Sequence, residues 1–214
     1  MNNTLRVSEI FCSIQGEARE VGFPTVFIRL TGCPLRCVWC DTAYAFHGGE
    51  VMSFDAILRQ TRAFNIPRVT VSGGEPLAQK NCLSLLGLLC DEGFKVSLET
   101  SGAIDVSSVD ERVTKVVDVK APGSGEVDKN RIQNYSSLNK KDQLKFVLAD
   151  RADYDWALTH IDENQLLERC DILFSPVYNQ LSATDLGDWI LAEGLPVRLQ
   201  IQLHKLLWGE VPGT

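Results

Sequence analysis

Short β-rich runs alternate with helical patterns along almost the whole chain of 214 residues. Alternation of this kind is typical of an α/β domain with a mainly parallel sheet, because each strand needs a crossover helix before the next parallel strand. The pattern therefore predicts an α/β fold. Strands are expected near residues 9–14, 25–30, 68–71, 95–98, 115–119, 144–148, 172–174 and 197–202.

Helical patterns lie between these strands. The first shows how they are bounded: Ser53 can cap a helix, and the helix must end before Pro67 because proline lacks a backbone donor and clashes in a helix interior. Further helices are expected at residues 83–90 closed by Gly93, at residues 154–167, and at residues 186–192 between a Thr184 cap and Gly194.

One domain is the simplest account of the chain. No internal repeat, low-complexity tract or linker divides residues 1–214, and residues 121–141, rich in Gly, Ser, Asn and Lys, are expected to form a long surface loop. The length falls below the ~250 residues of a closed eight-stranded α/β barrel. We therefore expect a partial, open TIM-like barrel in a single domain.

The composition makes several classes of protein unfavourable. With 21 Lys and Arg against 28 Asp and Glu, the net charge of −7 repels a phosphate backbone, so we expect no nucleic-acid partner. No run approaches the ~20 apolar residues of a membrane span. The chain starts with polar residues rather than a signal peptide, and its seven cysteines are an odd number, so we expect a cytoplasmic protein with free thiols.

Three of the seven cysteines lie within eight residues. Cys33, Cys37 and Cys40 directly follow the predicted strand at residues 25–30, and α/β barrels place their chemistry at such strand ends. Three thiolates on a short loop can bind one iron–sulfur cluster, because each sulfur reaches a different iron. A cluster of four irons would then keep one iron open for another ligand.

The alternative for these cysteines is a structural Zn²⁺ site completed by His47 or Cys12. Structural zinc sites usually consist of two paired-cysteine halves, and the sequence has no second half. The other cysteines, Cys82, Cys90 and Cys170, are expected to be core thiols.

A second segment, Ser72-Gly73-Gly74-Glu75-Pro76, follows the predicted strand at residues 68–71. Consecutive glycines let a ligand approach the backbone closely, and Glu75 offers an acceptor for an ammonium group. Taken alone, the segment is also consistent with an ordinary turn between a strand and a helix.

Together the two motifs resemble the radical S-adenosylmethionine (SAM) superfamily, in which C-x3-C-x2-C, with an aromatic residue such as Trp39 before the last cysteine, binds a [4Fe-4S] cluster. Within it, the chain is similar to the 7-carboxy-7-deazaguanine synthase family over nearly its whole length. The segments that carry this likeness are Ser13-Ile14-Gln15-Gly16-Glu17, Cys40-Asp41-Thr42, Glu99-Thr100-Ser101-Gly102 and Gln202-Leu203-His204-Lys205.

The resemblance implies a lyase that converts 6-carboxy-5,6,7,8-tetrahydropterin to 7-carboxy-7-deazaguanine by ring contraction with release of ammonia, a step in queuosine biosynthesis. It also implies a [4Fe-4S] cluster, SAM and Mg²⁺ as cofactors, a homodimer, and an electron donor such as flavodoxin or ferredoxin. Two alternatives stay open. One is a radical SAM activase acting on a partner protein, and the other is a non-catalytic zinc-binding module.

The resemblance further assigns roles to individual residues. The cluster ligands are Cys33, Cys37 and Cys40, and Thr42 resembles the Mg²⁺ ligand, which suits a hard cation. The implied SAM contacts are Trp39, Cys40, Asp41, Gly74, Glu75, Lys120 and Pro176. The implied substrate contacts are Ile14, Gln15, Gly16, Glu17, Arg29, Ser72, Glu99 and His204.

Several of these residues also have a structural interpretation. Arg29, at a strand end, can bind a carboxylate with two hydrogen bonds or form a structural ion pair. Glu99 can accept N–H bonds from the pyrimidinone edge of the pterin, or serve as a cap or salt-bridge partner. His204 is expected to face the substrate, although a lone histidine on a strand is more often a core residue. Before Lys120, Asp118 and Val119 depart from the Ser-Pro-Lys pattern of relatives, which leaves their contact with SAM open.

Overall fold

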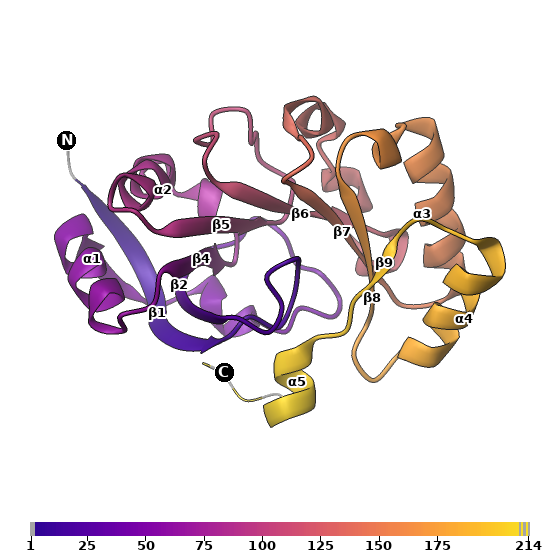
Figure 1. Cartoon of the computed structure of the whole chain (residues 1–214), viewed down its shortest axis with the longest axis horizontal. Coiled ribbons are helices and arrows are strands. Elements are labelled where there is room, and N and C mark those ends of the chain that lie inside the picture. The colour runs from indigo at the N-terminus through magenta and orange to yellow at the C-terminus, as the bar shows by residue number, and fades with distance from the viewer. Residues whose placement is uncertain (1–2, 210, 212, 214) are drawn as a thin grey trace.

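The computed structural model describes residues 3–209, 211 and 213. In this part of the chain nine strands form one sheet in the order β3-β1-β2-β4-β5-β6-β7-β8-β9 (Figure 1). β1 is antiparallel to β2 and β3, and all other neighbours are parallel. The strands are β1 (Thr4–Ile14), β2 (Pro24–Leu30), β3 (Glu50–Ser53), β4 (Arg68–Gly73), β5 (Lys95–Thr100), β6 (Thr114–Lys120), β7 (Gln143–Leu148), β8 (Asp171–Pro176) and β9 (Arg198–Leu199).

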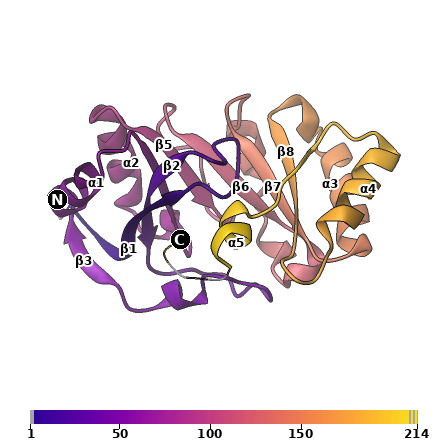
Figure 2. The same cartoon turned by 60° about the horizontal axis from the view of Figure 1, so that its bottom comes forward.

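The sheet is open. Its two end strands, β3 and β9, are each paired on one side, with β1 and β8. Figure 2 shows the strands fanning across the molecule from the β1 end to the β8 end without closing into a ring. The prediction of an α/β fold with a partial, open barrel is therefore confirmed.

Helices cover the sheet at both of its ends. Figure 1 shows α1 and α2 beside the first strands, α3 and α4 beside the last ones, and α5 near the C-terminus in the middle. No helix in the described part of the chain is long and apolar enough to cross a membrane. The helices are α1 (Phe54–Ala63), α2 (Cys82–Asp91), α3 (Arg151–Glu163), α4 (Ala183–Glu193) and α5 (Leu203–Trp208).

The boundaries of two helices, α3 and α4, differ from the sequence-based prediction. The Ser53 cap of α1 is confirmed, because its side chain accepts the N–H of Ala56. The cap of α4, however, is Ser182 and not Thr184, since the Ser182 hydroxyl accepts the N–H groups of both Thr184 and Asp185. α3 begins after an Asp150 cap, three residues before the predicted start, and ends at Glu163.

The end of the chain also differs from the prediction. The strand expected at residues 197–202 is reduced to β9, after which the chain forms α5, so His204 lies on a helix and not on a strand. The side chain of Gln200 accepts the N–H of Ala18 and draws this segment toward the end of β1. Residues 121–141 are not a plain surface loop: they contain three 3₁₀ helices (Pro122–Ser124, Val127–Lys129 and Ile132–Ser137) with Ser124, Asn134 and Tyr135 buried.

Candidate functional site

A cavity of about 470 Å³ lies at the carboxyl ends of the parallel strands. This volume is within the range of about 300–1,000 Å³ of ligand sites. Nearly all of the residues that the sequence singled out line it together: Ile14, Gln15, Glu17, Arg29, Cys33, Cys37, Trp39, Cys40, Asp41, Thr42, Ser72, Gly74, Glu99, Lys120, Pro176 and His204. Gly16 and Glu75 lie outside the lining.

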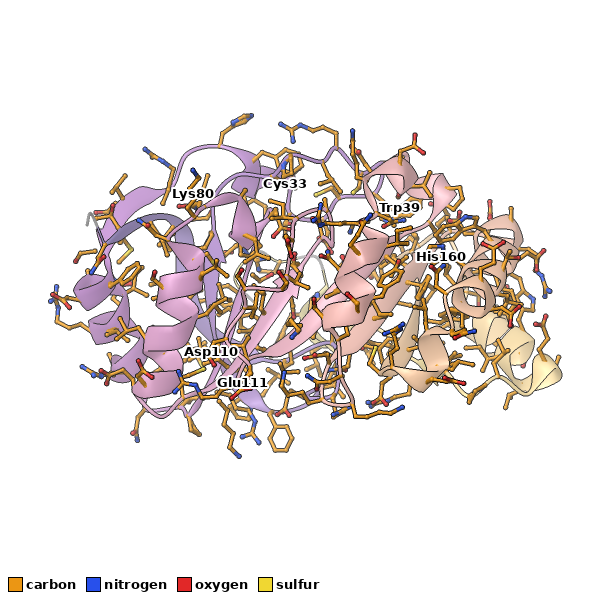
Figure 3. The ribbon with its side chains drawn as sticks, turned by 90° about the horizontal axis from the view of Figure 1, so that it is seen from above. Cys33, Trp39, Lys80, Asp110, Glu111 and His160 are labelled. Carbon is orange, nitrogen blue, oxygen red and sulfur yellow. The ribbon has the colours of Figure 1, made fainter. Side chains whose placement is uncertain are left out.

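The three cysteines of the motif reach the cavity from the loop that follows β2. Leu35, which is only 2% exposed, anchors this loop in the protein. Cys33, Cys37 and Cys40 are free and partly exposed, and burial raises the pKa of the Cys33 and Cys37 thiols. Figure 3 shows Cys33 and Trp39 at one edge of the molecule, with Asp110 and Glu111, which precede β6, at the opposite edge. The cysteines thus lie at the edge where the parallel strands end.

Two observations bear on the two metal sites that the sequence left open. Tetrahedral zinc requires its donors to converge within about 2.3 Å of one ion. Among the described residues, no three His, Cys, Asp or Glu side chains form such a group, and neither Cys12 nor His47 lines the cavity. Three cysteines around a shared cavity fit a multi-iron cluster better, because each thiolate binds a different metal atom.

The glycine segment after β4 packs directly against the cysteine loop. The N–H of Gly74 donates to the carbonyl of Leu30 at 3.2 Å, and the N–H of Glu75 donates to the carbonyl of Gly32 at 2.8 Å. A side chain at Gly74 would collide with the Gly32 carbonyl and the Cys33 side chain. Glycine is therefore required here by the close approach of the two loops.

The Glu75 carboxylate does not provide the free acceptor that the sequence suggested. It is fully buried and accepts the N–H of Leu77, the hydroxyl of Thr100, and both the N–H and the hydroxyl of Ser101. The side chain thus ties the end of β4 to the end of β5. Its predicted contact with SAM has no support in this geometry, because protein donors already surround the carboxylate.

A network of charges forms the floor of the cavity. Lys145, on β7, lies 2.5 Å from Glu17 and 3.1 Å from Asp118, and Lys120 lies 2.8 Å from Asp118. Burial alone would lower the pKa of Lys145 and raise that of Asp118. The attraction between the opposite charges outweighs burial. The pKa of Lys145 is therefore well above the usual value for lysine, and the pKa of Asp118 is below the usual value for aspartate. Lys145 and Asp118 are therefore both ionised at neutral pH.

Lys145 was not identified from the sequence. The sequence does contain one indication of its role: a charged residue inside the apolar run at residues 144–148. The alternation of a strand places Lys145 on the opposite face from Leu144 and Phe146. In a strand buried on both faces the alternation is weak, because Val147, on the same face as Lys145, is also apolar.

Glu99 lies beside this network at the end of β5. Its carboxyl accepts bonds from the Gln15 amide at 3.3 Å and from the Ser72 hydroxyl at 3.0 Å. Burial raises the pKa of Glu99. Three predicted substrate residues from three different strand ends are thus held in mutual contact.

Arg29 forms the ion pair that the sequence left as an alternative. Its Nε donates to Glu9 at 2.6 Å, and the same carboxylate oxygen accepts the hydroxyl of Tyr44 at 2.8 Å. Burial raises the pKa of Tyr44 to about 12. The ion pair uses only Nε of the guanidinium, and Arg29 still lines the cavity.

The C-terminal segment closes one side of the cavity. Lys205 on α5 lies 3.1 Å from Asp41, which directly follows the cysteine motif, and Gln202 donates to Glu17 at 2.7 Å. His204 packs on Gly16, where a side chain would collide with the imidazole, and burial lowers the pKa of His204. Gly16 therefore contributes by making room for His204 and not by lining the cavity.

Thr42 and Pro176 complete the wall near the cysteines. The Thr42 hydroxyl lies 3.9 Å from the Cys40 sulfur, and Pro176 ends β8. Lys205 and Tyr178 also line the cavity, with the lysine ammonium 5.1 Å from the centre of the tyrosine ring. Lys205 belongs to the last of the matching sequence segments, but the sequence predicted no role for either residue.

Comparison with known proteins shows which families this chain is similar to. The Radical SAM superfamily matches residues 27–120. The chain is 45% identical to a 7-carboxy-7-deazaguanine synthase of Chlorobaculum tepidum, over 95% of this chain and 94% of that protein. It is 38% identical to the enzyme of the same name from Koribacter versatilis, over 95% and 97%.

A solved structure shows the same fold. The crystal structure of QueE from Escherichia coli matches with a TM-score of 0.78 at 24% sequence identity, covering 94% of this chain and 95% of that one. At this identity the match supports the architecture alone. The open α/β sheet is thus found in a second protein of similar length.

Proposed function

Since the chain belongs to the 7-carboxy-7-deazaguanine synthase family of radical SAM enzymes, we propose which residues of the cavity carry out that family's reaction. The protein is a radical SAM lyase that converts 6-carboxy-5,6,7,8-tetrahydropterin to 7-carboxy-7-deazaguanine and ammonia, in queuosine biosynthesis. The observation that carries the assignment of residues is the cavity itself. It brings three cysteines, a glycine loop and a set of buried charges from distant parts of the chain to one place.

Cys33, Cys37 and Cys40 would hold the [4Fe-4S] cluster, and SAM would lie between the cysteine loop and the strand ends. Bound there, cluster and SAM supply the one-electron chemistry that removes a hydrogen atom from the substrate. Gly74 lets its loop pack against Cys33, and its backbone, which lines the cavity, would contact SAM. The other side chains proposed to contact SAM are Trp39, Asp41, Lys120 and Pro176, all of which line the cavity. Glu75 would not contact SAM itself but would hold the backbone of Gly74 in place.

The pterin would be held from two sides. Each carboxyl oxygen of Glu99 accepts one hydrogen bond, from Gln15 or from Ser72, and keeps a further lone pair. These lone pairs would accept N–H groups of the pyrimidinone ring. Arg29 would donate its two terminal NH₂ groups to the substrate carboxylate, while Glu9 keeps the guanidinium in place through Nε. This arrangement orients the reacting carbon toward SAM, and fixed orientation is a large part of catalysis.

The remaining substrate residues would shape and dry the cavity. Lys145 pairs with one carboxyl oxygen of Glu17, and Gln202 donates a hydrogen bond to the other. Ile14, at the end of β1, and the half-buried His204, on α5, line the cavity and would enclose the ring. A closed cavity excludes water from a reaction that solvent would interrupt.

Mg²⁺ would bind at Thr42. A hydroxyl is an acceptable ligand for this hard cation, which keeps several water and substrate oxygens. The proposal predicts that Thr42→Val raises the Mg²⁺ concentration required for half-maximal turnover, whereas Thr42→Ser keeps it. Equal Mg²⁺ dependence of both variants and the wild type would refute the role of Thr42.

We also propose a homodimer in the cytoplasm that receives electrons from a small redox protein such as flavodoxin or ferredoxin. All seven cysteines are free, which suits a reducing compartment. Leu206, Leu207 and Trp208 expose apolar surface on α5, and a second copy could cover it. Light scattering of the purified protein checks the mass, and a Leu206→Glu variant that stays dimeric would exclude this surface as the interface.

Anaerobic turnover tests the proposal as a whole. The reconstituted protein is incubated with SAM, dithionite, Mg²⁺ and 6-carboxy-5,6,7,8-tetrahydropterin, and the products are identified by mass. We expect 7-carboxy-7-deazaguanine from the wild type and from Cys12→Ala, and none from Cys33→Ala. Formation of 5′-deoxyadenosine alone would support the activase alternative, and an equal loss in Cys12→Ala would refute the three-cysteine assignment.

A further inference from the structure

A segment far along the chain holds the cysteine loop. The N–H of Arg36, between Cys33 and Cys37, donates to the Glu126 carboxylate at 2.5 Å. The N–H of Val38, between Cys37 and Cys40, donates to the carbonyl of Ser124 at 3.0 Å. Each of the two gaps in the C-x3-C-x2-C motif is therefore tied by one hydrogen bond to residues 121–126, which we call the clamp segment.

The clamp segment is itself fixed from within. Ser124 is 1% exposed; its hydroxyl donates to the carbonyl of Ala121 at 2.6 Å and accepts the N–H of Glu126 at 3.2 Å. This short internal bond sets the position from which Glu126 reaches Arg36. The segment is therefore a rigid turn and not a mobile linker.

A buried acid on α3 anchors the other side of the clamp segment. Asp153 is 2% exposed, and its carboxylate accepts the N–H of Gly123 at 2.8 Å and that of Ala149 at 3.1 Å. Any side chain at Gly123 would press on this carboxylate, so glycine is required for the close approach. The cysteine loop is thus connected through the clamp segment to α3 and the end of β7.

Among the described residues, few other contacts fix the outer part of the cysteine loop, one of them being the Arg36 guanidinium 4.3 Å from the centre of the Phe46 ring. Leu35 is buried, but Val38 is 76% exposed and Arg36 is exposed. Within the loop, the guanidinium of Arg36 donates to the carbonyls of Cys33 and Leu35. These local bonds stabilise the turn, whereas the bonds to Ser124 and Glu126 fix its position relative to the sheet.

We propose that the clamp segment presets the spacing of the three cysteines before the cluster binds, and that Glu126 is the positioning residue of this clamp. Glu126 does not line the cavity and touches no ligand position, so it acts through the backbone of the cysteine loop. The inference rests on the proposed cluster role of Cys33, Cys37 and Cys40. A preset loop loses less conformational entropy when it binds its ligand.

Hydrogen–deuterium exchange of the protein without its cluster tests the clamp directly. We compare Glu126→Ala, which removes the acceptor, with Glu126→Gln, which keeps one, and with Asp128→Ala as a matched control, since Asp128 is an exposed acid two residues away. Exchange at residues 35–39 should rise about tenfold in Glu126→Ala, as expected for one lost charge-assisted hydrogen bond. Glu126→Gln and Asp128→Ala should resemble the wild type.

Cluster stability provides the second measurement. After anaerobic reconstitution, the cluster absorbance should bleach faster in air in Glu126→Ala than in Glu126→Gln, while all variants keep the melting temperature of the wild type. Unchanged exchange in Glu126→Ala, or an equal rise in Asp128→Ala, would overturn the clamp. Failure of the wild type to bind iron would instead refute the proposed function, since the exchange experiment needs no cluster.

Discussion

The two faces of the parallel strands have different roles: one packs in the core and the other carries the charged residues of the cavity. The six residues of β7 show both roles. On the face toward the helices, Leu144, Phe146 and Leu148 are fully buried in the hydrophobic core. On the face toward the cavity, Lys145 forms ion pairs with charges from other segments. One strand thus contributes stability on one side and chemistry on the other, so single substitutions should affect one property far more than the other.

The other strands repeat this division. Val117 and Val119 of β6 belong to the core, whereas Asp118 and Lys120 line the cavity. Burying these charges is unfavourable unless each has a partner, and Asp118 is paired with both Lys120 and Lys145. The cavity face therefore depends on pairing, and the helix face on packing.

The largest expected effect is on the cavity face. Cys37→Ala removes one of the three proposed cluster ligands and should reduce product formation below detection. The apoprotein should melt within about 2 °C of the wild type, because the half-buried Cys37 side chain is not part of the hydrophobic core. Product assays and calorimetry on the same preparation check both statements. Substantial turnover by Cys37→Ala would contradict the division.

A large change on the helix face should give the reverse result. Phe146 packs against Phe174 and Trp156, with ring centres 5.6 and 6.4 Å away. Phe146→Ala should lower the free energy of unfolding by about 3–5 kcal/mol. Urea denaturation measures this loss, and the folded fraction at low temperature should keep its KM. A variant of normal stability with a raised KM would show that the faces are not separable.

Lys145→Met tests the pairing on the cavity face. It retains the side-chain volume but leaves Glu17 without its lysine and Asp118 with Lys120 alone, so we expect kcat/KM to fall about a hundredfold. The free energy of unfolding should change less than in Phe146→Ala, since methionine fills the space, Glu17 keeps its hydrogen bond from Gln202, and Asp118 keeps its ion pair with Lys120. Lys140→Met, at an exposed position, is the control. If both variants were equally active, the network would have no role in turnover.

The smallest expected effect is a pH dependence shared by the two faces. Burial lowers the pKa of His160, on the helix face, and of His204, on the cavity face. The unfolded chain then binds protons more readily, so stability is fully present above about pH 6.5 and declines as the pH falls toward the folded-state values. Thermal melting between pH 7 and 5.5 should show this decline, reduced in His160→Gln. A rise in stability on acidification would contradict the assignment.

The sequence was most informative where one local rule decides the outcome. Alternating strands and helices predicted the sheet, and the cysteines placed directly after a strand predicted the edge at which the cavity lies. Positions with two physical interpretations were not decided. Whether Arg29 forms an ion pair depends on Glu9, which lies on a neighbouring strand, and whether Glu75 is free depends on Thr100 and Ser101.

Residues that act across long sequence separations could not be predicted. Glu126 meets Arg36 across 90 positions, and Lys205 meets Asp41 across 164. Such pairs depend on how the loops fold back over the strand ends, and local periodicity in the sequence does not predict the path of a loop. For the same reason α5 was missed: its six residues are too short for a helical period, and it is positioned by the contacts of His204 with Gly16 and of Lys205 with Asp41.

The position of the iron is the most direct test of the proposed site. An anomalous difference map at the iron edge, from crystals grown without oxygen with SAM present, should show one cluster enclosed by Cys33, Cys37 and Cys40 at the carboxyl ends of the strands. A zinc signal there, a peak beside Cys12 or another cysteine, or a cluster with a different set of ligands would contradict this account.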